Sequence, residues 1–189
     1  MPKGRNSFGV DSSTQGFRGF LMLRLLLFRH GRAVPHDQGP DISRSLTATG
    51  RRESDEIAKA LHEGGVVPDL VLVSPAIRTR ETWDSAKGFF TSSEVRFERD
   101  LYLAIPDTIL SLIHAIEEGP KTVVIIGHNP ALHDLALDFF GFGDRYAFAR
   151  LRDEFPTSGC AVFDFDVSSW AELAPNKGRL DRFLVPAGE

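Results

Sequence analysis

The sequence predicts an α/β fold, a three-layer sandwich with a mostly parallel central sheet and helices on both faces. Short, almost entirely apolar runs at 23–28, 69–73 and 122–126 are typical of central strands that are covered on both faces. Helical patterns separate these strands, and the alternation of strands with helices favours a largely parallel sheet. The chain has 189 residues, of which 42% are hydrophobic, enough for one domain with a full core.

The first half of the chain shows clear helix boundaries. After the first strand, a loop with several Gly and Pro residues leads to a helix that has Thr47 as its N-cap and ends at Gly64 and Gly65. Ser74 and Pro75 follow the second strand and predict the start of the next helix. We expect Pro75 in the first turn of that helix, where its missing N–H costs nothing.

The second half continues the alternation and ends in two strands that alternate apolar and polar residues. The helix after residue 105 carries its apolar residues on one face, and Asn129-Pro130 begins the next helix. We expect strands at 95–97, 122–126, 161–167 and 179–185, the last two joined near Trp170, and helices at 106–118 and from 129 to about 140.

Composition excludes several classes of protein and site. Ordinary hydrophobicity with 25% charged residues excludes wholesale disorder. Cys160 is the only cysteine, which excludes an internal disulfide framework and a metal site of several thiolates. The formal net charge of −4 does not indicate a nucleic-acid partner. The longest apolar run, 20–28, is interrupted by Arg24 and is far shorter than the roughly 20 residues of a membrane span, so we expect no membrane partner.

The first 21 residues differ from the rest of the chain. They hold three basic residues and one acidic residue, a net charge of +2, and are rich in Gly, Ser and Asn. We expect a flexible or surface-draped N-terminal extension over 1–21 and a single domain over 22–189, with Met22 as an alternative start of translation. The extension lacks the continuous apolar core of a signal peptide, so we expect a cytoplasmic protein.

Basic side chains follow three of the predicted strands. Arg29 and His30 come directly after the first strand, Arg78 comes shortly after the second, and His128 follows the strand at 122–126. In α/β sheets, ligands bind beyond the carboxyl ends of the strands. We therefore expect two arginines and two histidines to converge at one edge of the sheet.

Arginine and histidine together suit a phosphoryl group. Arginine offers a planar fork of donors with a permanent charge, and histidine titrates near neutrality and can be a nucleophile, a proton carrier or a donor. The sequence has no carboxylate cluster at metal-ligand spacing near these residues, and it has no Gly-x-x-x-x-Gly-Lys loop. We expect a dianionic group attacked by an imidazole, with charge neutralised by arginine and with neither metal nor cofactor.

The motifs around these residues carry a resemblance to a known family. They are Arg29-His30-Gly31, Arg44-Ser45-Leu46-Thr47-Ala48-Thr49-Gly50, Ser74-Pro75-Ala76-Ile77-Arg78-Thr79-Arg80-Glu81-Thr82, Leu101-Tyr102-Leu103-Ala104-Ile105-Pro106-Asp107, Gly127-His128-Asn129-Pro130 and Phe155-Pro156-Thr157-Ser158-Gly159. Together they resemble the histidine phosphatase superfamily, which has a phosphoglycerate-mutase-like fold. The resemblance runs from about residue 23 to 186 and is closest to the SixA-type phosphohistidine phosphatase branch.

The resemblance implies a role for each of the four basic residues. His30 would be the nucleophile and would carry the phosphoryl group as a covalent phosphohistidine. One nitrogen of its ring would face the phosphorus unprotonated while the other donates to a backbone carbonyl. Arg29 and Arg78 would hold phosphoryl oxygens, and His128 would donate to the same group.

Four further residues are less firmly placed by the resemblance. Asp100 is the first candidate for an acid that protonates the leaving group, Asp107 is the second, and the absence of such an acid is the third possibility. Arg32 is expected to bind phosphate at the mouth of the pocket, with a solvated surface side chain as the alternative. Thr157 is expected to place a backbone N–H near the phosphate, with a simple turn as the alternative.

Three functions follow from this resemblance and these residues. The first is a phosphatase for phosphorylated histidine on a protein partner such as a phosphotransfer domain. The alternative is a phosphomonoesterase of the same superfamily acting on a small metabolite phosphate. A non-catalytic module that only binds phosphate or another oxyanion is the third.

Overall fold

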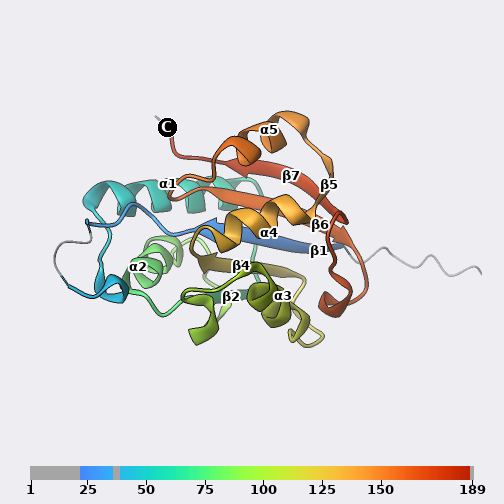
Figure 1. Cartoon of the computed structure of the whole chain (residues 1–189), viewed down its shortest axis with the longest axis horizontal. Helices are drawn as coiled ribbons and strands as arrows, with labels where there is room; N and C mark the ends of the chain where they lie inside the picture. Colours follow the sequence, from blue (N-terminus) through green and yellow to red (C-terminus); the bar gives the residue numbers. More distant parts are fainter. Residues whose placement is uncertain (1–21, 36–38, 188–189) are drawn as a thin grey trace, which may run out of the picture.

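A single seven-stranded sheet forms the centre of the protein in the computed structural model, which describes residues 22–35 and 39–187 (Figure 1). The strand order is β3-β2-β4-β1-β6-β7-β5. The strands are β1 (Met22–Arg29), β2 (Leu70–Val73), β3 (Glu94–Phe97), β4 (Thr122–Gly127), β5 (Phe140–Gly143), β6 (Cys160–Asp166) and β7 (Gly178–Leu184). The helices are α1 (Ala48–Glu63), α2 (Ile77–Ala86), α3 (Pro106–His114), α4 (Ala131–Phe139) and α5 (Arg145–Asp153), with 3-10 turns η1 (Asp41–Ser43), η2 (Arg99–Leu101) and η3 (Trp170–Glu172).

The sheet is mostly parallel, as the sequence predicts. Strands β1, β4, β2 and β3 run parallel to one another, and β5 runs parallel to β7. Strand β6 is antiparallel to both of its neighbours, β1 and β7. The carboxyl ends of β1, β2 and β4 therefore open at the same edge of the sheet.

Helices cover both faces of the sheet and complete three layers. On β1, Leu25 and Leu27 pack into one core together with residues of α3, α4 and α5. Leu26 and Phe28 point to the opposite face and pack with residues of α1 and α2. All four side chains are fully buried, which explains why this strand is a continuous apolar run.

Most predicted elements are confirmed, and four features differ from the prediction. Thr47 is the N-cap of α1 and accepts a hydrogen bond from the Gly50 N–H at 3.0 Å, as predicted. The position predicted for Pro75 is wrong, because Ala76 is the N-cap in an extended conformation and α2 begins only at Ile77. Helix α3 ends at His114, four residues before the predicted end. Strand β5 and helix α5 were not predicted.

The predicted extension over 1–21 lies outside the described residues. Within the described part of the chain, no helix combines the length and the apolar character that crossing a membrane requires.

Two glycines bring α1 against the loop that follows β1. A Cβ on Gly50 would lie 2.2 Å from the Arg32 carbonyl oxygen, and a Cβ on Gly31 would lie 2.6 Å from the Gly50 carbonyl oxygen. The Thr47 N–H donates to the same Arg32 oxygen at 2.9 Å. This close approach fixes the backbone immediately after His30. It therefore helps to position the His30 side chain as well as to pack α1 against the loop.

We expect Gly50→Ala to lower the free energy of unfolding by about 1–3 kcal/mol, because the added methyl group overpacks this contact. Gly88→Ala is a matched control, since a Cβ there would meet nothing within 4 Å and should change stability by less than about 0.5 kcal/mol. Urea denaturation measures both values, and equal stabilities for the two variants would contradict this account.

Candidate active site

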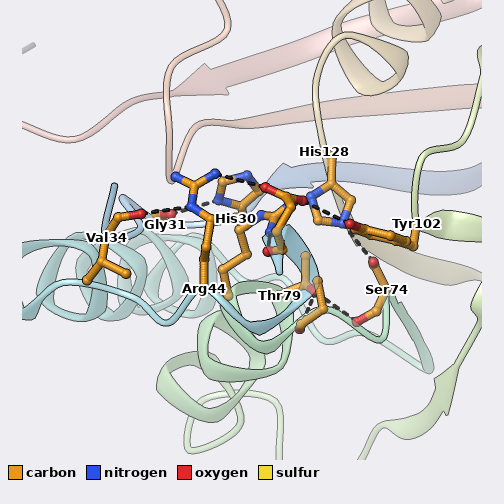
Figure 2. A network of polar contacts seen from close by, with 11 residues as sticks. His30, Gly31, Val34, Arg44, Ser74, Thr79, Tyr102 and His128 are labelled. Atoms are coloured by element: carbon orange, nitrogen blue, oxygen red, sulfur yellow. Dashed lines mark hydrogen bonds and ion pairs between the residues drawn. The ribbon is translucent and has the colours of Figure 1, made fainter. Parts of the chain in front are cut away.

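The two predicted histidines face each other at the carboxyl edge of the sheet. His30 follows β1 and His128 follows β4, and their ring centroids are 5.2 Å apart. The His30 backbone N–H donates to the Gly127 carbonyl at 3.1 Å, which ties the two strand ends together. Figure 2 shows both rings within one network of polar contacts.

His30 is held as one particular neutral tautomer. Its Nδ1 lies 2.7 Å from the Gly31 carbonyl oxygen, which can only accept, so Nδ1 carries the hydrogen. Burial lowers the pKa of His30 to about 4; the hydrogen bond to Gly31 opposes this effect, and the positive charges of Arg78, Arg29 and Arg44 add to it. At neutral pH the ring is uncharged, and Nε2 bears a lone pair.

His128 has one bonded and one unsatisfied nitrogen. Its Nε2 lies 2.7 Å from the hydroxyl of Ser74, which is fully buried. Its Nδ1 is buried and has no hydrogen-bond partner among the described residues. Burial, together with the charges of His30 and Arg78, lowers the pKa of His128 to about 3. When the Ser74 hydroxyl donates to Nε2, Nδ1 carries the hydrogen and is a donor.

Arg78 enters the site from the first turn of α2 and is buried. Its Nη1 donates to the Asp41 backbone carbonyl at 2.7 Å, and its Nη2 donates to Asp41 Oδ2 at 2.9 Å. Its Nε is buried without a hydrogen-bond partner in the described parts of the chain. Unsatisfied buried polar groups cost free energy. A bound anion would satisfy this Nε together with Nδ1 of His128.

Asp41 is the carboxylate of the site. Its Oδ1 accepts from Arg44 Nη1 at 3.0 Å, and its Oδ2 accepts from the Tyr102 hydroxyl at 3.0 Å in addition to Arg78. Burial would raise the pKa of Asp41, but hydrogen bonds from Arg44, Arg78 and Tyr102 hold it well below its usual range. Asp41 is therefore ionised at every pH at which the protein would normally act.

Charge in the site matches a phosphoryl dianion. Arg29 donates from Nη1 to the Phe155 carbonyl at 2.7 Å, and its charge acts on the His30 ring together with those of Arg44 and Arg78. With both histidines neutral, three guanidiniums and the Asp41 carboxylate leave a net charge of +2 (three minus one). The set can therefore neutralise two negative charges on a phosphoryl group.

A cavity of about 410 Å³ opens at the side of this cluster formed by Asp41, Arg78 and His128. It is lined by Asp41, Arg78, Tyr102, Leu103, Ala104, His128, Asn129 and Pro130. Across residues 22–35 and 39–187, no three His, Cys, Asp or Glu side chains gather as ligands of a metal ion would. The site offers cationic and N–H groups for an anion.

Comparison with known proteins agrees with this geometry. Residues 25–102 match the model of the histidine phosphatase superfamily (branch 1). A structure described as the "putative phosphohistidine phosphatase SixA" from Agrobacterium tumefaciens is 32% identical in sequence; the similarity covers 87% of this chain and 98% of that one, with a TM-score of 0.74. The chain belongs to the histidine phosphatase superfamily.

Two further proteins are similar over most of the chain, and the first also carries the SixA name. A structure from Nakamurella multipartitia that carries the same name is 26% identical in sequence. The similarity covers 88% of this chain and 98% of that one, with a TM-score of 0.74. An uncharacterized protein of Mycobacterium leprae is 33% identical over 151 residues, which are 79% of this chain and 91% of the relative.

The structure of this histidine phosphatase brings together four of the predicted site residues. Arg29, His30, Arg78 and His128 converge at the carboxyl edge of the sheet, as the sequence predicts. The predicted hydrogen bond from His30 to a backbone carbonyl is present, with Gly31 as its acceptor.

Two of the other predicted residues do not line the cavity, and two lie in segments next to His30. Asp100 lies in η2 and Asp107 in the first turn of α3; both are exposed, and neither lines the cavity. The half-exposed Arg32 side chain reaches toward Glu53 of α1, with 3.9 Å between Nη2 and Oε1. Thr157 is partly buried in the loop before β6, and the next residue, Ser158, donates its N–H to the His30 carbonyl at 3.1 Å.

Sequence reasoning missed three residues of the site. Ser74 and Tyr102 lie in motifs that carried the family resemblance, but neither was given a role. Asp41 begins the short 3-10 turn η1, three residues before Arg44, and no periodic pattern in the sequence marks it. The one signal in the sequence was the position of Asp41 three residues before Arg44, a separation that allows an ion pair between the two side chains.

We expect NMR titration to show the His30 and His128 imidazoles uncharged at pH 6, with pKa values well below 6.5, near 4 and 3. Arg78→Met should raise the pKa of His30, because a neighbouring positive charge disfavours protonation of the ring. Titration of both wild-type rings near 6.5, or no change in Arg78→Met, would contradict the described electrostatics.

Proposed function

We propose that this protein hydrolyses phosphohistidine on proteins through a covalent phosphohistidine on His30, without a metal ion. The observation that carries the proposal is the hydrogen bond from His30 Nδ1 to the Gly31 carbonyl. It leaves the Nε2 lone pair as the nucleophile inside a set of charges suited to a dianion. The names of the Agrobacterium and Nakamurella relatives support the same substrate class.

In the first step, the Nε2 lone pair of His30 forms a bond to phosphorus while the bond between phosphorus and the substrate imidazole breaks. The substrate nitrogen leaves with that electron pair. Arg29 and Arg78 hold the phosphoryl oxygens, and Nδ1 of His128 donates to the same group. The His30 ring becomes positively charged as it bonds to phosphorus, and the Gly31 carbonyl stabilises this charge through Nδ1–H.

In the second step, water attacks the phosphorus of phosphorylated His30. The water oxygen bonds to phosphorus, and the bond from phosphorus to Nε2 breaks with its electron pair remaining on the ring. Both protons of the water stay with the product, which leaves as dihydrogen phosphate. His30 returns to its neutral form, protonated on Nδ1, so the cycle is balanced.

The protonation state of the pocket favours cleavage of a P–N bond. Asp41, the carboxylate among the cavity-lining residues, is ionised and has no proton to give to a leaving alkoxide. A phosphohistidine whose ring is protonated on its other nitrogen leaves as a neutral imidazole and needs no proton from the enzyme. An imidazole side chain also fits easily within about 410 Å³.

We expect the purified protein to dephosphorylate a phosphorylated histidine phosphotransfer domain in excess chelator. His30→Ala should lower kcat/KM by at least about a thousandfold, since it removes the nucleophile. His62→Ala, which alters an exposed histidine on α1, is the matched control and should retain activity.

A panel of sugar and nucleotide phosphates, assayed alongside, separates the other functions. A clear preference for these metabolites would replace the protein substrate with a small phosphate ester. Binding of phosphate without turnover of any substrate would indicate a non-catalytic module. Full activity in His30→Ala would contradict the mechanism itself.

A further inference from the structure

Exposed apolar side chains gather around the mouth of the cavity. Leu103 lines the cavity and is 78% exposed, and Ile105, two residues further along, is 61% exposed. Ile42 directly follows Asp41, and Ile77 directly precedes Arg78; both are also exposed. Since Asp41 is hydrogen-bonded to Arg78 and to Tyr102, the three segments that carry these residues meet at the site.

Phe97 extends this arc from the end of β3. It is 48% exposed, and the Arg80 guanidinium carbon lies 4.7 Å from the centroid of its ring. Arg80 is three residues after Ile77 on α2, so the two side chains share one face of that helix. Ile42, Ile77, Phe97, Leu103 and Ile105 are called the apolar rim below.

The backbone conformation of Leu103 is a second, independent observation that indicates a binding role for the apolar rim. Leu103 has φ = 57°, in the left-handed region that side chains other than Gly, Asn and Asp rarely adopt. This backbone presents a large apolar side chain to solvent. In the isolated protein, the exposed side chain contributes no burial that would offset the strain. Strain retained at an exposed apolar residue beside a catalytic pocket indicates a contact made with another molecule.

We propose that the apolar rim is the docking surface for a helix that carries the phosphorylated histidine of a substrate protein. This inference rests on the proposed function. Leu103 of the rim also lines the cavity, so a partner that covers the rim places a group beside Arg78 and His128, whose ring faces that of His30. Arg78 is only 6% exposed, so a phosphate reaches it on a side chain that projects past the rim.

A helical surface fits these requirements better than a free metabolite. On a helix, the residues three and four positions from a phosphohistidine lie on the same face and flank it. Apolar residues at those positions would cover the rim while the phosphorylated ring enters the cavity, as in other complexes where a helix packs an apolar face against its partner. A small phosphate ester would fill the cavity and leave the rim in water.

The test compares three substrates in the double variant Phe97→Ser/Ile105→Ser. Neither residue lines the cavity, and Ser at position 105, the N-cap of α3, favours the helix start. The substrates are a histidine phosphotransfer domain phosphorylated with phosphoramidate, free phosphohistidine and an aryl phosphate. We expect kcat/KM for the domain to fall at least about tenfold, the loss typical of truncating interface anchors. Values for the two small substrates should stay within about twofold.

Phe142→Ser is the matched control, because Phe142 is an exposed aromatic residue on β5 outside the rim. It should leave all three values unchanged. Wild-type protein that cleaves free phosphohistidine but not the domain would overturn the docking proposal and the protein substrate together. An active wild type with an equally active rim variant would overturn the docking surface alone. Equal losses on all three substrates would show that the rim acts in catalysis, which also overturns the proposal.

Discussion

The hydrogen bond between Nδ1 of His30 and the Gly31 carbonyl is the constraint on which the site depends. It fixes which nitrogen carries the lone pair, and the peptide between His30 and Gly31 is held in turn from α2. The Gly31 N–H donates to the Thr82 hydroxyl at 2.9 Å, and that hydroxyl donates to the Arg78 carbonyl. Helix α2, which supplies Arg78, therefore also anchors the backbone beside His30, so packing of α2 against the β1 loop positions both proposed site residues.

Electrostatic balance is the second principle of the site. Burial and nearby arginines keep both histidines neutral, which leaves a lone pair on Nε2 of His30 as the proposed mechanism requires. Asp41 binds Arg44 and Arg78 and reduces the positive charge without supplying a proton. This arrangement suits transfer of a phosphoryl dianion to a neutral ring with a leaving group that needs no acid. The exposed apolar rim, as the proposed docking surface, would favour a phosphorylated side chain carried on a protein over a small phosphate ester.

The sequence predicted what depends on strong local patterns, and it failed where tertiary contacts decide. Apolar strands and the rule for strand ends placed Arg29, His30, Arg78 and His128 at one edge. Pro75 was misplaced because the Ser74 N–H still donates to the Ile126 carbonyl of β4, so the helix begins only after this pairing with the sheet ends. Strand β5 has the sequence Phe-Gly-Phe-Gly, which carries little strand signal, and it exists through pairing with β7. Helix α5 did have a readable signal, since Asp144 caps it through the N–H groups of its first turn.

The atom that receives the phosphoryl group tests the central claim most directly. Protein labelled with ¹⁵N-histidine can be mixed with a phosphorylated substrate, quenched in alkali, which preserves phosphohistidine, and analysed by ³¹P–¹⁵N correlation together with peptide mapping. The account predicts phosphorus bonded to Nε2 of His30. Phosphate on Nδ1 of His30, on His128, or on no histidine at any time during turnover would contradict it.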